Sequence, residues 1–427
     1  MQLLIRGGRV IDPASGTDTR ADVLVEDGRI AAIGPALTCP GAQQLPARGL
    51  VVAPGLVDMH VHLRQPGFEY KVTVATGFAA AARGGVTAVA AMANTKPPAD
   101  SPEVIEQVRA LAAGTGAEVL PVGAVTVGLR GEDLTDFAAL KAAGAAALSD
   151  DGVPIQSEAL LRRALLGAKA VGLPLLDHCE DLDLVKNYAV NAGAVADKLG
   201  IPGRPARAEV MQVERDVRLS LETGAHVHIC HVSAAGSVEA VRQGKARGAR
   251  VTCETCPQYF TLTEDAVLEK GSLARVNPPL RTPKDVAAIR EGLMDGTIDA
   301  IVTDHAPHSA EEKALPLTQA PSGMVGLETS LALSLTGLYH AGFLTLSQVI
   351  EKMSAAPAAV LGLGETMGAL AIGRRADLVL FDPDETWTID PAQFASKGRN
   401  TPFGGCVVRG RVKYTISKGK IIYRQEG

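Results

Sequence analysis

Residues 57–64, VDMHVHLR, form a short β-rich segment that ends in two histidines and an arginine. Seven more segments of this kind follow, each before ten or more residues of helical composition, and this alternation predicts parallel strands joined by helical crossovers. Eight such units over about 250 residues favour a TIM (β/α)8 barrel over an open doubly wound sheet, because no G-x-G-x-x-G motif follows the first strand. The eight predicted strands are residues 57–63, 87–94, 118–126, 145–152, 174–179, 226–232, 250–256 and 299–307.

The two ends of the chain have a different pattern. Residues 1–52 read as short strands separated by turn signals, among them Asp27-Gly28, and the last sixty or so residues read the same way, with a turn at Gly419. Neither end has a helical period. We therefore expect an α/β barrel domain at residues 53–365 and one small β-sandwich domain built from residues 1–52 and 366–427.

Composition excludes several classes of function. The 427 residues include 42 Lys and Arg and 47 Asp and Glu, and the net charge of −5 argues against a surface for nucleic acid or for an anionic membrane. The N-terminus lacks a signal-like apolar run, and no stretch approaches the ~18 apolar residues of a membrane span. We expect a cytoplasmic protein with a small-molecule substrate.

The six cysteines are too sparse for a disulfide scaffold, so reduced thiols are expected. Cys253 and Cys256 form a C-x-x-C motif, but no second such pair and no histidine pair follow at zinc-finger spacing. We interpret this pair as structural.

The first predicted strand ends in three polar side chains that share one face. Residues 60, 62 and 64 alternate with Val61 and Leu63, so His60, His62 and Arg64 should point the same way. Polar groups in a packed barrel interior are costly without partners. Barrel enzymes carry their catalytic residues at the carboxyl ends of strands, which favours a functional role for these three.

Other predicted strands also end in residues that bind metals. Histidines and carboxylates together suit zinc or another first-row divalent ion, and the lack of a thiolate-rich set argues against a closed structural site. The set exceeds what one tetrahedral ion needs, so two ions about 3.5 to 4 Å apart, bridged by a carboxylate, would use it best. These strand ends contain Asp150 and Asp151, Asp177 to Glu180, His231, and Asp304 to His308.

Four histidines are predicted to be structural. If His231 faces the barrel centre, alternation places Val227 and Ile229 inward and directs His226 and His228 toward the outer helices. His305 is out of phase with Asp304, and His340 lies in a late helical stretch.

Several motifs together resemble dihydroorotases of the bacterial class I type, within the amidohydrolase superfamily. They begin with PGLVDMHVHLRQPGFEYK at residues 54–71, TGFAAAARGGVTAV at 76–89 and MANTKPP at 92–98. They continue as LSDDG, DHCED, HVS, VNPPLR, TDHAPH and GMVGLE, so the resemblance covers essentially the whole chain.

The resemblance implies two Zn²⁺ ions per subunit, with Asp304 acting both as a metal ligand and as the catalytic acid and base. Many relatives bridge their ions with a carbamylated lysine, but residues 145–152 contain no lysine, so Asp151 is the expected bridge. Ala93 and Ser322 differ from the family pattern. The implied metal ligands are His60, His62, Asp151, His178, His231 and Asp304, and the implied substrate contacts are Arg64, Asn94, Asn277, His308, Ser322 and Gly323.

The activity implied is the reversible hydrolysis of dihydroorotate to N-carbamoyl-L-aspartate, a step of pyrimidine biosynthesis. A hydantoinase or an allantoinase is the nearer alternative, although Arg64 would then have no obvious partner. A non-catalytic scaffold for aspartate carbamoyltransferase is the other alternative, but such a protein should have lost ligands. We also expect a homo-oligomer, with aspartate carbamoyltransferase as a possible partner.

Overall fold

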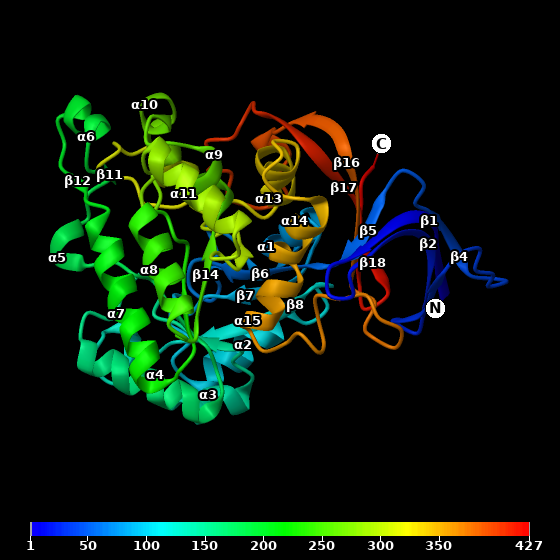
Figure 1. Ribbon diagram of the computed structural model, residues 1–427, viewed down its shortest axis with the longest axis horizontal. Coiled ribbons are helices and arrows are strands. Elements are labelled where there is room, and N and C mark those ends of the chain that lie inside the picture. Colours follow the sequence, from blue (N-terminus) through cyan, green and yellow to red (C-terminus); the bar gives the residue numbers. More distant parts are fainter. Residues whose placement is uncertain (1, 427) are drawn as a thin grey trace.

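Eight parallel strands form the central sheet of the computed structural model, which describes residues 2–426 (Figure 1). They are hydrogen-bonded in the order β15-β14-β13-β10-β9-β8-β7-β6. The two ends of this sheet approach each other, since Val61 pairs with His305 in a parallel bridge and the amide of His62 donates to the His305 carbonyl across 2.9 Å. The predicted barrel is confirmed. Each predicted strand overlaps one strand of the structure, with shifts of a residue or so at some N-terminal ends. The barrel strands are β6 (Leu56–Val61), β7 (Val86–Ala91), β8 (Glu118–Gly123), β9 (Ala147–Leu148), β10 (Leu175–Asp177), β13 (Val227–Ile229), β14 (Val251–Thr255) and β15 (Ala300–Ile301).

Amphipathic helices cover the outside of the barrel. Alternate strand residues such as Val89 and Leu175 pack in one apolar cluster with helix residues such as Phe78 and Leu161. Polar caps begin these helices and glycines end several of them; for example, Ser157 caps the fourth helix, which Gly172 ends at φ 67°. The main crossover helices are α1 (Val74–Arg83), α2 (Pro102–Ala112), α3 (Phe137–Ala143), α4 (Glu158–Val171), α7 (Arg207–Thr223), α8 (Ala235–Ala246), α11 (Pro283–Met294) and α14 (Leu346–Met353).

Shorter elements lie in the connections. A small parallel pair, β11 (Val190–Asn191) and β12 (Gly203–Arg204), follows the fifth barrel strand. The others are α5 (Leu182–Val185), α6 (Ala194–Leu199), α9 (Pro257–Thr261), α10 (Ala266–Lys270), α12 (Ala310–Lys313), α13 (Ser330–Ser334), α15 (Ala355–Val360) and the helical turns Val127–Leu129, Gly271–Ala274, Leu335–Tyr339 and Pro391–Gln393.

Strands from both ends of the chain form the second sheet, at the right of Figure 1. Its order is β18-β17-β16-β5-β1-β2-β3, with β4 also paired to β1. The predicted turns are present, with φ of 47° at Asp27 and 81° at Gly28, and 75° at Gly419. The sheet contains β1 (Gln2–Asp12), β2 (Thr17–Glu26), β3 (Arg29–Gly34), β4 (Gln43–Pro46), β5 (Val51–Pro54), β16 (Leu378–Thr388), β17 (Val407–Ser417) and β18 (Lys420–Arg424).

This second sheet surrounds its own apolar core. Leu3, Val23, Ile30, Leu380 and Ile416, which come from both ends of the chain, belong to one buried cluster. The prediction that the two termini build one β structure is therefore confirmed. The domain limits at residues 52/53 and 365/366 stay a prediction.

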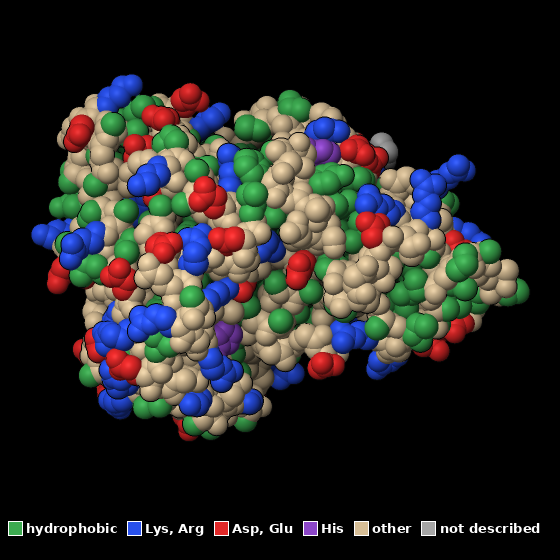
Figure 2. All heavy atoms as spheres, viewed as in Figure 1, with side chains coloured by type: hydrophobic (Ala, Val, Ile, Leu, Met, Phe, Trp, Pro, Cys, Tyr) green, Lys and Arg blue, Asp and Glu red, His purple; other side chains and the backbone are tan. Residues whose placement is uncertain are grey.

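The surface agrees with the balanced charge of the sequence. In Figure 2, Lys and Arg are interspersed with Asp and Glu over the face that is shown, without a broad area of one sign. Among residues 2–426, no helix is both long and apolar enough to cross a membrane.

Candidate metal and active site

Asp151 lies at the centre of four histidines at the carboxyl ends of the barrel strands. Its Oδ1 is 3.5 Å from His60 Nε2, 3.4 Å from His178 Nδ1 and 3.4 Å from His231 Nε2. Its Oδ2 is 3.4 Å from His62 Nε2. All five side chains are buried. Because both oxygens of Asp151 lie near histidines, the carboxylate can be shared between two positions for a cation.

Asp304 completes one side of this group. Its Oδ1 is 3.1 Å from His62 Nε2 and 3.7 Å from His60 Nε2. Although burial favours the protonated acid, the hydrogen bond from His62 and the nearby imidazoles lower the pKa of Asp304. The carboxylate is therefore ionised at neutral pH and can act as a ligand or as a base.

Two sets of three ligand atoms share Asp151. One set is His60, His62 and Asp151, the other is Asp151, His178 and His231, and within each set the ligand atoms lie within 4.8 Å of one another. Neither His60 Nε2 nor Asp151 Oδ1 has a hydrogen-bond partner among the described residues. Buried polar atoms without partners are costly, and a cation between them would satisfy both.

The electrostatics of His60 also favour a positive charge here. Burial lowers the pKa of the ring, but Asp151 and Glu254 on its two sides raise it, and the net result is a pKa well above the usual value. A proton or a metal cation can supply that charge.

The adjacent aspartate has a different environment. Asp150 Oδ1 accepts the amide hydrogens of Val125 and Thr126 across 2.7 and 3.1 Å, so this side chain fastens β9 to the segment after β8. Asp151 instead projects among the histidines. Alternation along the strand alone left both aspartates open, and the structure separates them.

A cavity of about 150 Å³ opens directly against the cluster. Of the predicted substrate contacts, Arg64, Asn94, Asn277, Ser322 and Gly323 line it, together with His62, Asp151, His178, His231 and Asp304. Arg64 is partly exposed, yet its Nε is buried and has no hydrogen-bond partner within residues 2–426. A cation with a free donor at this wall is suited to an anionic group in the cavity.

The predicted contact His308 is not among the residues that line this cavity. Its Nε2 lies 2.9 Å from the carbonyl oxygen of Ser322, and its Nδ1 lies 3.2 Å from Lys71 Nζ. His308 therefore supports the loop that contains Ser322 and Gly323.

Several site residues have an unusual backbone. Arg64, His231 and Asp304 have φ of 60°, 33° and 47°, in the left-handed region that residues other than glycine rarely adopt. Each lies beyond the last residue of its strand, since β6 ends at Val61, β13 at Ile229 and β15 at Ile301. Strained positions of this kind concentrate at functional sites.

This backbone explains one wrong prediction, the outward orientation of His226 and His228. Val227 and Ile229 pack with the outer helices, whereas His228 Nε2 lies 3.2 Å from Glu254 Oε2 beside His60. The prediction extended strict alternation from His231, but the regular strand ends before that residue.

The remaining histidines and cysteines make structural contacts. His305 Nδ1 accepts the amide hydrogens of Gly326 and Leu327, and His340 Nε2 donates to the Pro383 carbonyl. Cys253 packs in the apolar cluster between the barrel strands and the outer helices, and Cys256 packs in a second buried apolar cluster. Both positions agree with a structural role for this pair.

Sequence reasoning missed Glu254 and Arg204, two charged residues that support the site, and included Glu180 only among the possible metal-binding residues at a strand end. Glu254 Oε1 lies 2.6 Å from His60 Nδ1, Glu180 Oε2 lies 3.3 Å from His178 Nε2, and Arg204 Nη1 pairs with Glu180 Oε1 across 2.8 Å. Glu254 had a detectable signal, because a charge in the middle of a predicted buried strand must be paired.

Models of two protein families match the chain. The model described as "Dihydro-orotase-like" matches residues 49–237, and the model described as "Amidohydrolase family" matches residues 277–423. Together they span most of the barrel and the C-terminal strands.

Curated relatives match over the full length. Dihydroorotase from Pelotomaculum thermopropionicum is 50% identical and is aligned over 99% of this chain and 98% of its own. Dihydroorotase from Syntrophotalea carbinolica is 49% identical over 99% of both chains, and that from Geobacter metallireducens is 48% identical over 100% of both.

Solved structures with the same architecture include hydantoinases and dihydropyrimidinases. L-hydantoinase from Arthrobacter aurescens has a TM-score of 0.90 at 26% identity, covering 100% of this chain and 96% of its own. Dihydropyrimidinase from Brevibacillus agri has a TM-score of 0.86 at 26% identity, covering 99% and 95%. The much higher full-length identity to dihydroorotases decides between these relatives, and the chain belongs to the dihydroorotase family of the amidohydrolase superfamily.

Proposed function

We propose that this protein catalyses the reversible hydrolysis of dihydroorotate to N-carbamoyl-L-aspartate. The observation that carries the proposal is the position of Arg64, a cation in the wall of the same cavity that contains Asp151, Asp304 and the histidines. A substrate with both a hydrolysable ring amide and a carboxylate uses both features. Sequence identity near 50% to dihydroorotases over the full length supports the same choice.

The histidines and aspartates fit two zinc ions. We assign His60, His62 and Asp304 to one ion and His178 and His231 to the other, with Asp151 between them. The partnerless atoms His60 Nε2 and Asp151 Oδ1 support this assignment, as does a donor set of imidazoles and carboxylates. When bound, two such ions lower the pKa of a water molecule toward neutrality and polarise the substrate carbonyl.

Asp304 is assigned as the catalytic acid and base. It lies in the wall of the cavity, and its lowered pKa keeps it ionised at the start of ring opening. It then accepts the proton of the attacking water and passes it to the ring nitrogen as the amide bond breaks. In the reverse direction it begins protonated, gives that proton to the carboxyl oxygen that leaves as hydroxide, and accepts a proton from the nitrogen that closes the ring.

Arg64 is assigned to the carboxylate of the substrate. A guanidinium forms paired, charge-assisted hydrogen bonds with a carboxylate, and the Nε of Arg64 has a free proton to donate. Asn94 and Asn277 offer amide groups at the same cavity, and Ser322 and Gly323 offer the loop that His308 supports.

One assay separates this proposal from the alternatives. Purified protein is analysed for zinc and is then offered dihydroorotate, hydantoin and allantoin in parallel. We expect metal to be present and dihydroorotate to be turned over with at least about a hundredfold preference. Preference for hydantoin or allantoin would reassign the enzyme, and metal-free protein without turnover would make it a scaffold. Gel filtration alone and with aspartate carbamoyltransferase tests the proposed homo-oligomer and partner.

A further inference from the structure

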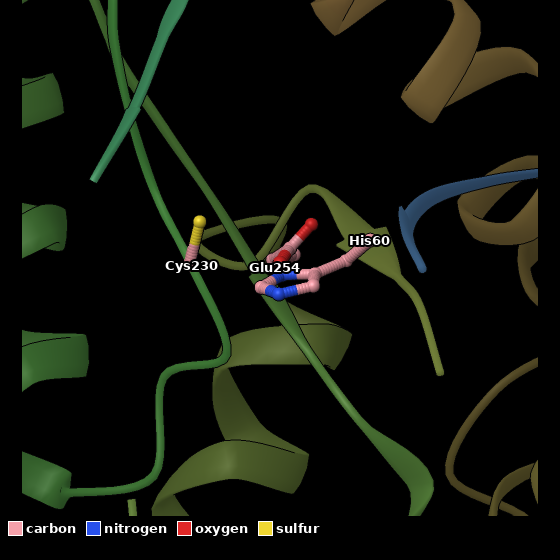
Figure 3. A group of neighbouring side chains, drawn as sticks. All are labelled: His60, Cys230 and Glu254. Carbon is pink, nitrogen blue, oxygen red and sulfur yellow. Dashed lines mark hydrogen bonds and ion pairs between the residues drawn. The ribbon is translucent and has the colours of Figure 1, made fainter. Parts of the chain in front are cut away.

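A carboxylate that the proposed reaction does not use holds the ring of His60 from behind. Glu254, in β14, is fully buried, and its Oε1 lies 2.6 Å from Nδ1 of His60. Figure 3 shows the Glu254 carboxyl group against the His60 ring, with Cys230 nearby. A separation of 2.6 Å is that of a charge-assisted hydrogen bond and leaves no room for an ion between the two atoms. His60 therefore donates its Nδ1 proton to Glu254.

A chain of side chains continues from Glu254 through the barrel interior. Glu254 Oε2 lies 3.2 Å from His228 Nε2, and His228 Nδ1 lies 2.8 Å from Thr252 Oγ1. The same hydroxyl lies 2.8 Å from His226 Nε2. These are the two histidines whose predicted outward orientation is wrong.

One hydroxyl group joins the two histidines of this chain. The Thr252 hydroxyl has one proton, so it donates to at most one of the two rings, and at least one ring donates to it. His228 Nε2 is the ring nitrogen that faces Glu254 Oε2, and neither of these two buried atoms has another hydrogen-bond partner among the described residues. Glu254 therefore has a ring nitrogen near each of its two carboxylate oxygens.

We propose that Glu254 is a positioning residue that fixes the tautomer of His60, and that His228 and Thr252 hold Glu254 in place. With its proton on Nδ1, His60 presents an unprotonated Nε2 toward Asp151 and Asp304. A carboxylate behind a histidine ligand also makes the ring more basic. The inference rests on the proposed metal-dependent function, because the benefit is tighter binding of the ion that His60 contacts.

The test compares two buried glutamates in the full-length, zinc-loaded protein. Glu254→Gln keeps the shape of the side chain and removes its charge. Glu328→Gln is the matched control, since Glu328 is also buried but accepts the amide hydrogens of Ala395 and Ser396. In titrations with a competing chelator, we expect E254Q to bind one of its two zinc ions about 10- to 100-fold more weakly than the wild type does. E328Q should bind both ions as tightly as the wild type.

A spectroscopic measurement distinguishes positioning from a purely structural role. In the loaded wild type, the Nδ1 proton of His60 should give a strongly downfield resonance, absent from His60→Gln, that moves upfield in E254Q. If E254Q does not fold, His228→Gln replaces it in the test, and this variant should bind one zinc ion several-fold more weakly than the wild type. Wild-type protein without metal would refute the proposed function. Loaded wild type with unchanged metal affinity and resonance in the variants would refute this inference alone.

Discussion

Replacing Arg64 with methionine tests the basis of substrate choice. Methionine keeps a long side chain in the wall and removes the guanidinium that lines the cavity. Removing one partner of a buried ion pair costs about 3 to 5 kcal/mol. Arg64 is partly exposed in the open cavity, so solvent screening places the loss at the lower end of this range. About 3 kcal/mol corresponds to a roughly hundredfold fall in kcat/KM for dihydroorotate.

The assay measures initial rates in both directions for the wild type, Arg64→Met and Arg64→Lys. Lysine restores the charge without the planar pair of donors, so its loss should lie between the other two. Hydrolysis of neutral hydantoin by the same preparations serves as the control and should change less than about threefold, because that ring has no carboxylate. Equal losses on both rings would show that Arg64 supports the structure of the site instead.

Three other perturbations follow from the site and from the chain behind it. Asp304→Asn should reduce turnover in both directions by about 10²- to 10⁴-fold with an unchanged circular dichroism spectrum, and retention of a tenth of the wild-type rate would remove its assignment as acid and base. Metal-depleted protein given zinc should recover equally with and without bicarbonate, because Asp151 is ready without CO₂, whereas Asp151→Ala should bind less metal; a bicarbonate requirement would contradict the carboxylate bridge. Burial lowers the pKa of His226 to about 4, so the neutral ring stabilises the fold fully above pH 6.5 and this contribution falls as the pH drops toward 4. Between pH 7.5 and 4.5 the free energy of unfolding, measured with denaturant, should therefore fall by about 2 to 3 kcal/mol less in His226→Gln than in the wild type. Equal falls in the two proteins would contradict a buried neutral ring.

The barrel could be predicted from sequence because its signal is repeated. Eight short β-rich segments, each followed by a helical stretch, leave few topologies once parallel strands require crossovers. The formation of the second sheet from both ends of the chain could also be predicted, since both ends have turn signals such as Asp27-Gly28 and no helical period. Pairings between distant strands, such as β5 with β16, were not readable, because local pattern contains no information on partners that lie over 300 residues apart.

The orientation of the site residues could be predicted where the backbone is regular and could not be predicted where it is irregular. His60 and His62 lie at or just beyond the end of β6, where alternation still holds, and the prediction that they share a face agrees with their common neighbour Asp151. His231 follows a strand that has already ended and has a positive φ, so alternation counted from it reversed the orientation of His228. Residues that must reach a shared cation from different strands depart from regular geometry, because eight strand ends cannot all aim at one point with the same backbone. Periodicity is therefore least reliable at the carboxyl end of a barrel strand, and there a buried charge such as Glu254, which needs a partner wherever it points, is the better guide to which side chains meet.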